Sequence, residues 1–209
     1  MFGFKKVGNI TTKKTIAPGL NKAEINPSDE EINHVKDYKI DMDNMLGNFY
    51  SEEVQVLDDP IYTQLKQDIL SHVKRYSNDV LGIENEMYIC LSWFTRNPPG
   101  SQMHRHQHRN SFISGCLYFT DGSPIKFWAD KSPLYNQFFD LQAKEYNLFN
   151  SSAWTLPIDK NYLLLWPSYV QHSVEMNDSN SDRISLAFNV FIKKEIGSEK
   201  FLTHLSFEK

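Results

Sequence analysis

SQMHRHQHRNSFISG at residues 101–115 and PSYVQHSVEMNDSNSDRISLAFNV at residues 167–190 are the two stretches around which this chain is organised. Together they hold four of its seven histidines. The first has histidines at alternate positions, and the second has one more histidine followed by an Arg-x-Ser segment. Imidazoles that converge from distant stretches are a common way to bind a transition metal, so the pattern gives a metal-site hypothesis.

The histidines of the first stretch can share a cation because side chains two apart in a strand point to the same side. This argument favours His106 with His108, and it fits His104 with His106 equally well. His172 would add a third ligand from another strand and leave positions for substrate and oxidant, as at a non-haem iron site. A solvated histidine-rich loop is the structural alternative. If the strand continues without a bulge, the face that carries His108 also carries Ser114, Cys116 and Tyr118.

The second stretch alternates a polar face with an apolar one. Arg183, Ser185, Ala187 and Asn189 form the first face, and the residues between them are apolar. An unpaired buried guanidinium is costly, so an inward-facing arginine needs an anion. A carboxylate-bearing cosubstrate held by Arg183 and Ser185 meets that need. The alternative is an ion pair within the protein, with Asp182 or Glu175.

Around these stretches the chain reads as short strands separated by turns. The strand-like runs are MYICLSWFT (87–95), FISGCLYF (112–119), IKFW (125–128), YLLLWP (162–167), HSV (172–174) and RISLAFNVFI (183–192). Many short strands joined by turn residues indicate a mainly β fold, a sandwich or barrel with helical support. We expect this core to span residues 87–192 of a single domain, 1–209.

Residues 58–82 predict the supporting helix. Asp59 and Pro60 are typical of a helix start, and Gly82 of its end. Apolar residues follow at spacings of three and four, which predicts one buried face. That face consists of Ile61, Leu65, Ile69, Val73, Tyr76 and Val80.

Three further segments are less regular. Residues 1–57 read as an irregular lead-in with one or two edge strands, and residues 193–209 as a polar tail or an edge element. Between them, residues 129–161 form an aromatic-rich insert that joins the two metal-binding stretches. This insert is a candidate for a lid or substrate wall, but packing of its aromatic residues against the barrel is the interpretation that we favour.

Composition limits the classes of function. A chain of 209 residues with 40% hydrophobic residues can bury one substantial core. Its net charge is -4 and its basic residues are scattered, so nothing indicates a nucleic-acid interface. Cys90 and Cys116 lie in apolar runs and read as free thiols of a reducing compartment. With no span of about 20 apolar residues and no signal-peptide core at the start, we expect a cytoplasmic protein, in the host cytoplasm if viral, with no membrane partner.

Taken as a set, four segments resemble the iron(II)- and 2-oxoglutarate-dependent oxygenases, in particular small oxygenases of bacteria and their viruses. The segments are SWF at residues 92–94, HQHRNSFISGCLYF at 106–119, WPSYVQHSV at 166–174 and RISLAFN at 183–189. The resemblance implies a double-stranded β-helix, also called a jelly-roll or cupin-like fold. It also implies a dioxygenase that hydroxylates a substrate while 2-oxoglutarate is converted to succinate and CO2.

The resemblance also assigns residues to roles. It implies that iron(II) is bound by His106, His108 and His172. Arg183 with Ser185 would bind the far carboxylate of the cosubstrate 2-oxoglutarate, and Tyr118 and Asn189 would assist as further cofactor-binding residues. Molecular oxygen is the other small-molecule partner implied. The prime substrate stays open, and a homodimer is compatible with the sequence.

Two departures from the family pattern and two rival functions qualify this expectation. The usual second ligand is a carboxylate, and a neutral imidazole there leaves the site one positive charge higher, which favours anionic 2-oxoglutarate but alters the metal's redox behaviour and selectivity. In addition, residues 159–161 (DKN) stand where a glycine turn is commoner. One rival is a non-catalytic metal-binding, cupin-like ligand-binding protein. The other is a three-histidine dioxygenase that does not use 2-oxoglutarate, which would have no need of Arg183 with Ser185.

Overall fold

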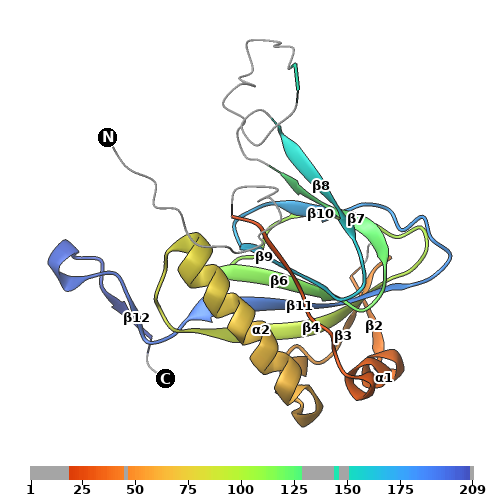
Figure 1. Ribbon diagram of the computed structural model, residues 1–209, viewed down its shortest axis with the longest axis horizontal. Coiled ribbons are helices and arrows are strands. Elements are labelled where there is room, and N and C mark those ends of the chain that lie inside the picture. The colour runs from red at the N-terminus through yellow and green to blue at the C-terminus, as the bar shows by residue number, and fades with distance from the viewer. Residues whose placement is uncertain (1–18, 45–46, 129–143, 146–150, 208–209) are drawn as a thin grey trace.

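The computed structural model describes residues 19–44, 47–128, 144–145 and 151–207, and these form two large antiparallel sheets and a small two-stranded one (Figure 1). The larger sheet has seven strands in the order β1-β9-β6-β11-β4-β3-β2. Its strands are β1 Asn21–Glu24, β9 Tyr162–Pro167, β6 Ile113–Tyr118, β11 Arg183–Ile192, β4 Met87–Asn97, β3 Phe49–Ser51 and β2 Ile40–Asp43. The smaller sheet comprises β5 Met103–His106, β10 His172–Val174, β7 Gly122–Trp128 and β8 Ala153–Ile158. This mainly β architecture is the jelly-roll class that the sequence predicts.

The larger sheet separates two apolar cores because side chains alternate between its faces. One face packs against the helices, and it includes Leu117, Leu163, Leu165, Leu186 and Phe188. The other face packs against the smaller sheet, and it includes Cys116, Tyr118, Leu164 and Trp166. A cavity that lies between the sheets is therefore lined by this second face.

The helical support agrees with the sequence over most of its length. Asp59 caps a short 3₁₀ turn, Pro60–Tyr62, by accepting a hydrogen bond from the Ile61 amide at 3.0 Å. The α-helix α2, Thr63–Arg75, then lies across the larger sheet (Figure 1). A π-helical segment, Tyr76–Leu81, follows and ends at Gly82, whose φ of 67° suits glycine. The π segment shifts the helical register, so Val80 is exposed rather than part of the buried stripe.

Several elements depart from the sequence expectations. A second helix, α1, spans Asp29–Asp37 inside the lead-in, and the reciprocal hydrogen bonds of Ser28 and Glu31 cap it. Strand β8 lies inside the expected insert, of which residues 129–143 and 146–150 are outside the described part of the chain. The C-terminal segment forms a two-stranded sheet, β12 Glu195–Ile196 with β13 Leu205–Ser206.

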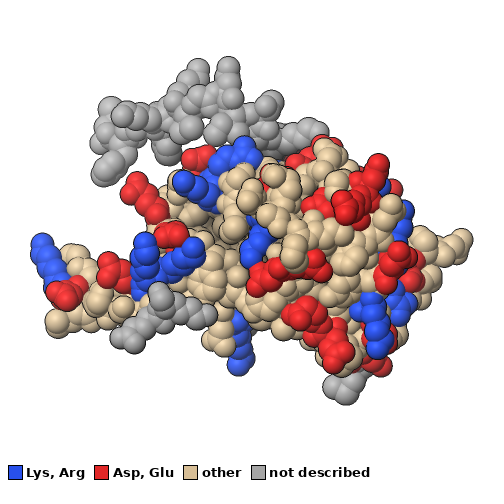
Figure 2. All heavy atoms as spheres, turned by 90° about the horizontal axis from the view of Figure 1, so that it is seen from below, with Lys and Arg blue, Asp and Glu red and all other residues tan. Residues whose placement is uncertain are grey.

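Local chemistry agrees with expectation at three further points. Asn161 replaces the usual turn glycine by adopting a φ of 69°, a region that asparagine tolerates. Cys90 and Cys116 are both free thiols. Acidic and basic side chains are interspersed on the face that Figure 2 shows, in line with the scattered charges of the sequence. Among the described residues, no helix combines the length and the apolar character needed to cross a bilayer.

Candidate metal centre and anion pocket

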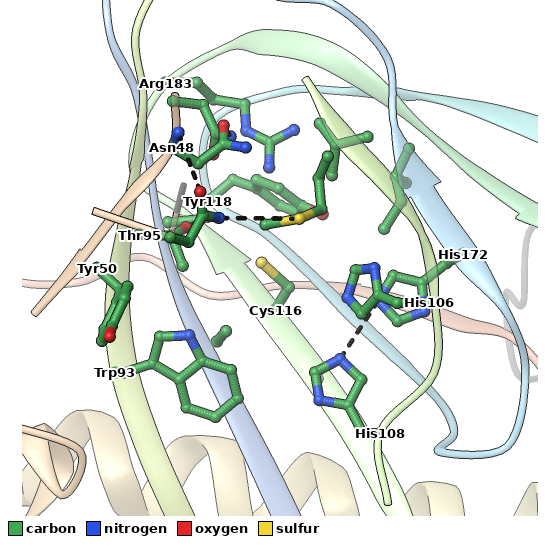
Figure 3. Close-up of a pocket in the computed structure, with 18 of the residues that line it drawn as sticks. Asn48, Tyr50, Trp93, Thr95, His106, His108, Cys116, Tyr118, His172 and Arg183 are labelled. Atoms are coloured by element: carbon green, nitrogen blue, oxygen red, sulfur yellow. Dashed lines mark hydrogen bonds between the residues drawn. The ribbon is translucent and has the colours of Figure 1, made fainter. Parts of the chain in front are cut away.

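Three imidazoles from distant parts of the chain converge between the two sheets (Figure 3). His106, His108 and His172 each offer a ring nitrogen, and these three atoms lie within 4.8 Å of one another. The Nε2 atoms of His108 and His172 are 3.4 Å apart. Two nitrogens that each lie ~2.1 Å from one tetrahedral metal ion are separated by roughly the same distance. The cluster therefore has the ligand types and the spacing of a metal site.

Backbone carbonyls orient two of these rings. His106 Nδ1 lies 2.9 Å from the His104 carbonyl oxygen, and His172 Nδ1 lies 3.2 Å from that of Val170. A carbonyl can only accept, so each Nδ1 carries the proton and each Nε2 keeps its lone pair for a metal. Outer-sphere hydrogen bonds of this kind are typical of histidine ligands.

Burial keeps all three rings neutral near pH 7. Desolvation lowers the pKa of His106 below its ordinary value. Burial first, and then the neighbouring His106, lowers the pKa of His108 to about 4. The same two causes, with an added contribution from His108, hold the pKa of His172 well below its ordinary value. Neutral imidazole is the form that binds metal, so protons compete with a cation only under acidic conditions.

The first histidine stretch is not one continuous strand, which corrects the parity argument. Strand β5 ends at His106, and residues 107–112 form a loop before β6 begins. His108 reaches the cluster from this loop, where its amide donates to the Ser168 carbonyl at 3.1 Å. The exposed His104 is not part of the group of three. The structure thus brings His108, rather than His104, to His106.

The other end of the cavity holds a buried guanidinium. Arg183, at the start of β11, is 3% exposed, and its guanidinium carbon lies 5.3 Å above the Tyr118 ring centre. One terminal nitrogen of Arg183 donates to the Ser123 carbonyl at 3.2 Å, while Nε has no hydrogen-bond partner. The Tyr118 hydroxyl is also buried without a partner. Such orphaned donors indicate a site for an acceptor such as a carboxylate.

The ion-pair alternatives for Arg183 are not what the structure shows. Asp182 pairs instead with Arg96, at 3.2 Å. Within the described part of the chain, neither Glu175 nor any other carboxylate forms an ion pair with Arg183. The guanidinium charge is therefore left for a ligand to neutralise.

The register of the larger sheet places a continuous set of residues between the histidine end and the Arg183 end of the cavity. Strand β11 pairs with β4 and β6, which sets Thr95, Ser185 and Tyr118 in one row and Trp93, Ala187 and Cys116 in the next. All six line the cavity, as do Arg183 and the three histidines. In Figure 3, Cys116 lies between the histidine cluster and Arg183.

Some lining residues were not expected from the sequence, and one expected residue is absent from the lining. Trp93 and Tyr50 face the cavity, and the Trp93 ring centre is 6.0 Å from that of His108. Tyr50 comes from the lead-in, where no periodic pattern marks it. Asn189 shares the polar face of β11, yet its side-chain oxygen accepts a hydrogen bond from Ser114 at 3.0 Å, and it does not line the cavity.

Comparison with known proteins agrees with this geometry. Residues 91–189 match the sequence model of a family described as "Putative 2OG-Fe(II) oxygenase". Over these residues the chain is similar to that family. The family segment begins inside β4 and ends inside β11, so it contains the histidine cluster and Arg183. No curated protein sequence matches the chain.

Solved structures of oxygenases share the fold. HygX from Streptomyces hygroscopicus, crystallised with nickel, 2-oxoglutarate and hygromycin B, superposes with a TM-score of 0.60 at 11% identity, over 83% of this chain and 82% of HygX. A Pseudomonas putida prolyl-4-hydroxylase gives a TM-score of 0.52 at 14% identity, over 82% of this chain and 92% of the hydroxylase. At these identities the likeness shows the fold alone.

Proposed function

We propose that this protein is an iron(II)- and 2-oxoglutarate-dependent dioxygenase that hydroxylates its substrate and releases succinate and CO2. One observation carries the proposal: a three-imidazole cluster and an ion-pair-free guanidinium share a single cavity. A metal cation at one end and a guanidinium at the other is the arrangement that a dianionic 2-oxo acid requires. The match to the family model and the shared fold support this proposal.

The residues at the two ends fit the two groups. His106, His108 and His172 would hold iron(II) through neutral nitrogens. When bound, the metal supplies the oxygen chemistry that protein side chains lack. Arg183 would bind the far carboxylate of 2-oxoglutarate through its unpaired Nε, and the Tyr118 hydroxyl would donate a second hydrogen bond.

The charge of the cavity supports a dianionic ligand. Among the described residues that line it, Arg183 is the one with a permanent charge, and no carboxylate is present. A divalent cation held by neutral histidines adds two further positive charges. An all-histidine ligand set therefore leaves the cavity strongly positive, and 2-oxoglutarate would neutralise most of this charge.

The two rival functions make less use of these features. A non-catalytic metal-binding barrel has no need of a buried guanidinium at the far end of the cavity. A three-histidine dioxygenase without 2-oxoglutarate would leave the Arg183 and Tyr118 donors unsatisfied, which is costly.

Conversion of 2-oxoglutarate to succinate tests the proposal. We expect succinate to form in the presence of iron(II) and oxygen. His172→Ala should abolish succinate formation, whereas His104→Ala, which removes an exposed imidazole outside the cluster, should not. Oxygen consumption without 2-oxoglutarate would favour the second rival. Metal binding without any turnover of 2-oxoglutarate would favour the first.

A further inference from the structure

The cavity has a third end that the metal and 2-oxoglutarate do not account for. In Figure 3, Arg183 and the histidine cluster occupy two corners, and Trp93 with Tyr50 occupies the remaining one. Both aromatic rings are half-buried and face the cavity. If the first two ends hold the metal and the cosubstrate, the third end is the place left for the substrate to be oxidised.

Strand pairing fixes the two rings on one wall. Tyr50 of β3 lies opposite Thr95 of β4, and Trp93 is two residues before Thr95 on the same strand. The two aromatic residues are therefore diagonal neighbours on one face of the sheet. Their placement depends on backbone pairing rather than on a loop.

This wall offers ring faces rather than charges. Among the described residues that line the cavity, there is no lysine and no carboxylate. The amides nearby already serve the scaffold: Asn97 donates to Asn48, and Asn48 donates to the Gln102 carbonyl at 2.6 Å. The Thr95 hydroxyl is hydrogen-bonded to the Ser185 hydroxyl, with 2.7 Å between the two oxygens. A charged group that entered this corner would lose its hydration and would find no counter-ion on the aromatic wall itself.

The aromatic wall is also next to the metal ligands. The Trp93 and His108 ring centres are 6.0 Å apart, with their planes inclined by 32°. A ring that stacks on Trp93 therefore lies beside the histidine cluster, within reach of chemistry at the metal. The polar edges of the indole and the phenol, Trp93 Nε1 and Tyr50 Oη, have no hydrogen-bond partner in the described part of the chain.

We propose that Trp93 and Tyr50 form the substrate subsite, and that it takes an uncharged ring, either a planar heterocycle or a sugar, by stacking. This inference rests on the proposed function for its location, because the third end is defined by the other two. Planar bases and the C–H faces of sugars both stack on aromatic side chains. Binding of a planar heterocycle and of a sugar can be compared directly by titration.

Ligand-observed NMR titration tests the subsite without relying on turnover. The protein is loaded with Zn²⁺, which is redox-inert, and with 2-oxoglutarate. Adenosine and methyl β-glucoside are the two uncharged ring probes, and adenosine monophosphate is the charged one. We expect one of the uncharged rings to bind, and the phosphate to add no affinity.

Variants locate the binding. Trp93→Ala should raise the Kd of the bound ring about tenfold, as expected for the loss of one stacking contact, and Trp93→Phe should raise it less. Tyr50→Ala provides a second test if Trp93→Ala does not fold. The matched control is Tyr88→Ala, which removes an aromatic residue from the same strand but outside the cavity.

Three results would overturn the subsite: neither uncharged ring binds at millimolar concentration, adenosine monophosphate binds more tightly than adenosine, or Trp93→Ala and Tyr88→Ala weaken binding equally. Calorimetry with Zn²⁺ and 2-oxoglutarate separates this failure from failure of the proposed function. If neither of them binds, the proposed function fails, and titration of the metal-free protein with the rings still decides whether Trp93 binds them.

Discussion

The arginine end and the histidine end of the cavity are built from different parts of the fold. Arg183, Ser185 and Tyr118 lie on β11 and β6, in the interior of the seven-stranded sheet, where both edges of each strand are paired. The histidines come from the four-stranded sheet and from the loop 107–112. One end is therefore fixed by sheet register, and the other depends on how a loop is held.

The loop is held by serine hydroxyl groups and by a few backbone hydrogen bonds rather than by regular strand pairing. Ser168 Oγ lies 2.7 Å from Ser111 Oγ and 2.8 Å from Ser114 Oγ, and the Ser168 carbonyl accepts from the His108 amide. Ser168 is buried. Because one end is built by sheet register and the other by a loop, we expect anion affinity and metal affinity to respond to separate sets of residues.

Loss of the guanidinium should give the largest effect. We expect Arg183→Leu to weaken 2-oxoglutarate binding to the Zn²⁺-loaded protein by about 100-fold, because a buried charge-assisted hydrogen bond contributes up to ~3 kcal/mol. Calorimetric titration with 2-oxoglutarate measures the change. Arg96→Leu removes an equal charge from a partly exposed ion pair and should change the Kd far less. Equal effects would show that Arg183 acts only through the overall charge of the protein.

Loss of one hydroxyl at the loop should have an intermediate effect. Ser168→Ala removes both serine contacts beneath His108, and we expect metal affinity to fall about tenfold, as for other outer-sphere changes at metal sites. Competition with a chromophoric chelator measures Zn²⁺ affinity. Ser77→Ala is the control, because Ser77 is equally buried but bonds to the Ile83 carbonyl, outside the cavity. An unchanged affinity in Ser168→Ala would mean that the loop holds His108 without these hydroxyls.

The arginine end of the cavity was easier to predict from the sequence than the histidine end, for a physical reason. A period of two forces Arg183 and Ser185 onto one face of β11, so alternation alone places them together. Alternation did not decide between His104 and His108, since the strand ends at His106 and His108 reaches the cluster through a loop. Periodicity carries no information about such a loop.

Two further differences have the same origin. The helical stripe was predictable as far as Tyr76, but the π-helical segment that exposes Val80 has no periodic signature. Helix α1 is a different case, because the expectation of an irregular lead-in overlooked the Ser-x-x-Glu spacing of Ser28 and Glu31, which marks a helix start. Tyr50 joins Trp93 only through the pairing of β3 with β4, a contact between strands far apart in the sequence.

A methyl group placed against the arginine should give the smallest effect and the sharpest separation of the two ends. A Cβ at Gly122 would lie 2.8 Å from Arg183 Cγ and 2.9 Å from Cδ, so Gly122→Ala must displace the side chain of Arg183. We expect 2-oxoglutarate affinity to fall several-fold, up to about tenfold, because overpacking of this kind costs ~1 kcal/mol or more. The same sample should bind Zn²⁺ with unchanged affinity, since Gly122 is not among the residues that line the cavity near the histidines. If Zn²⁺ affinity fell by the same factor, the two ends would not be independent, and the distinction between a sheet-built end and a loop-built end would fail.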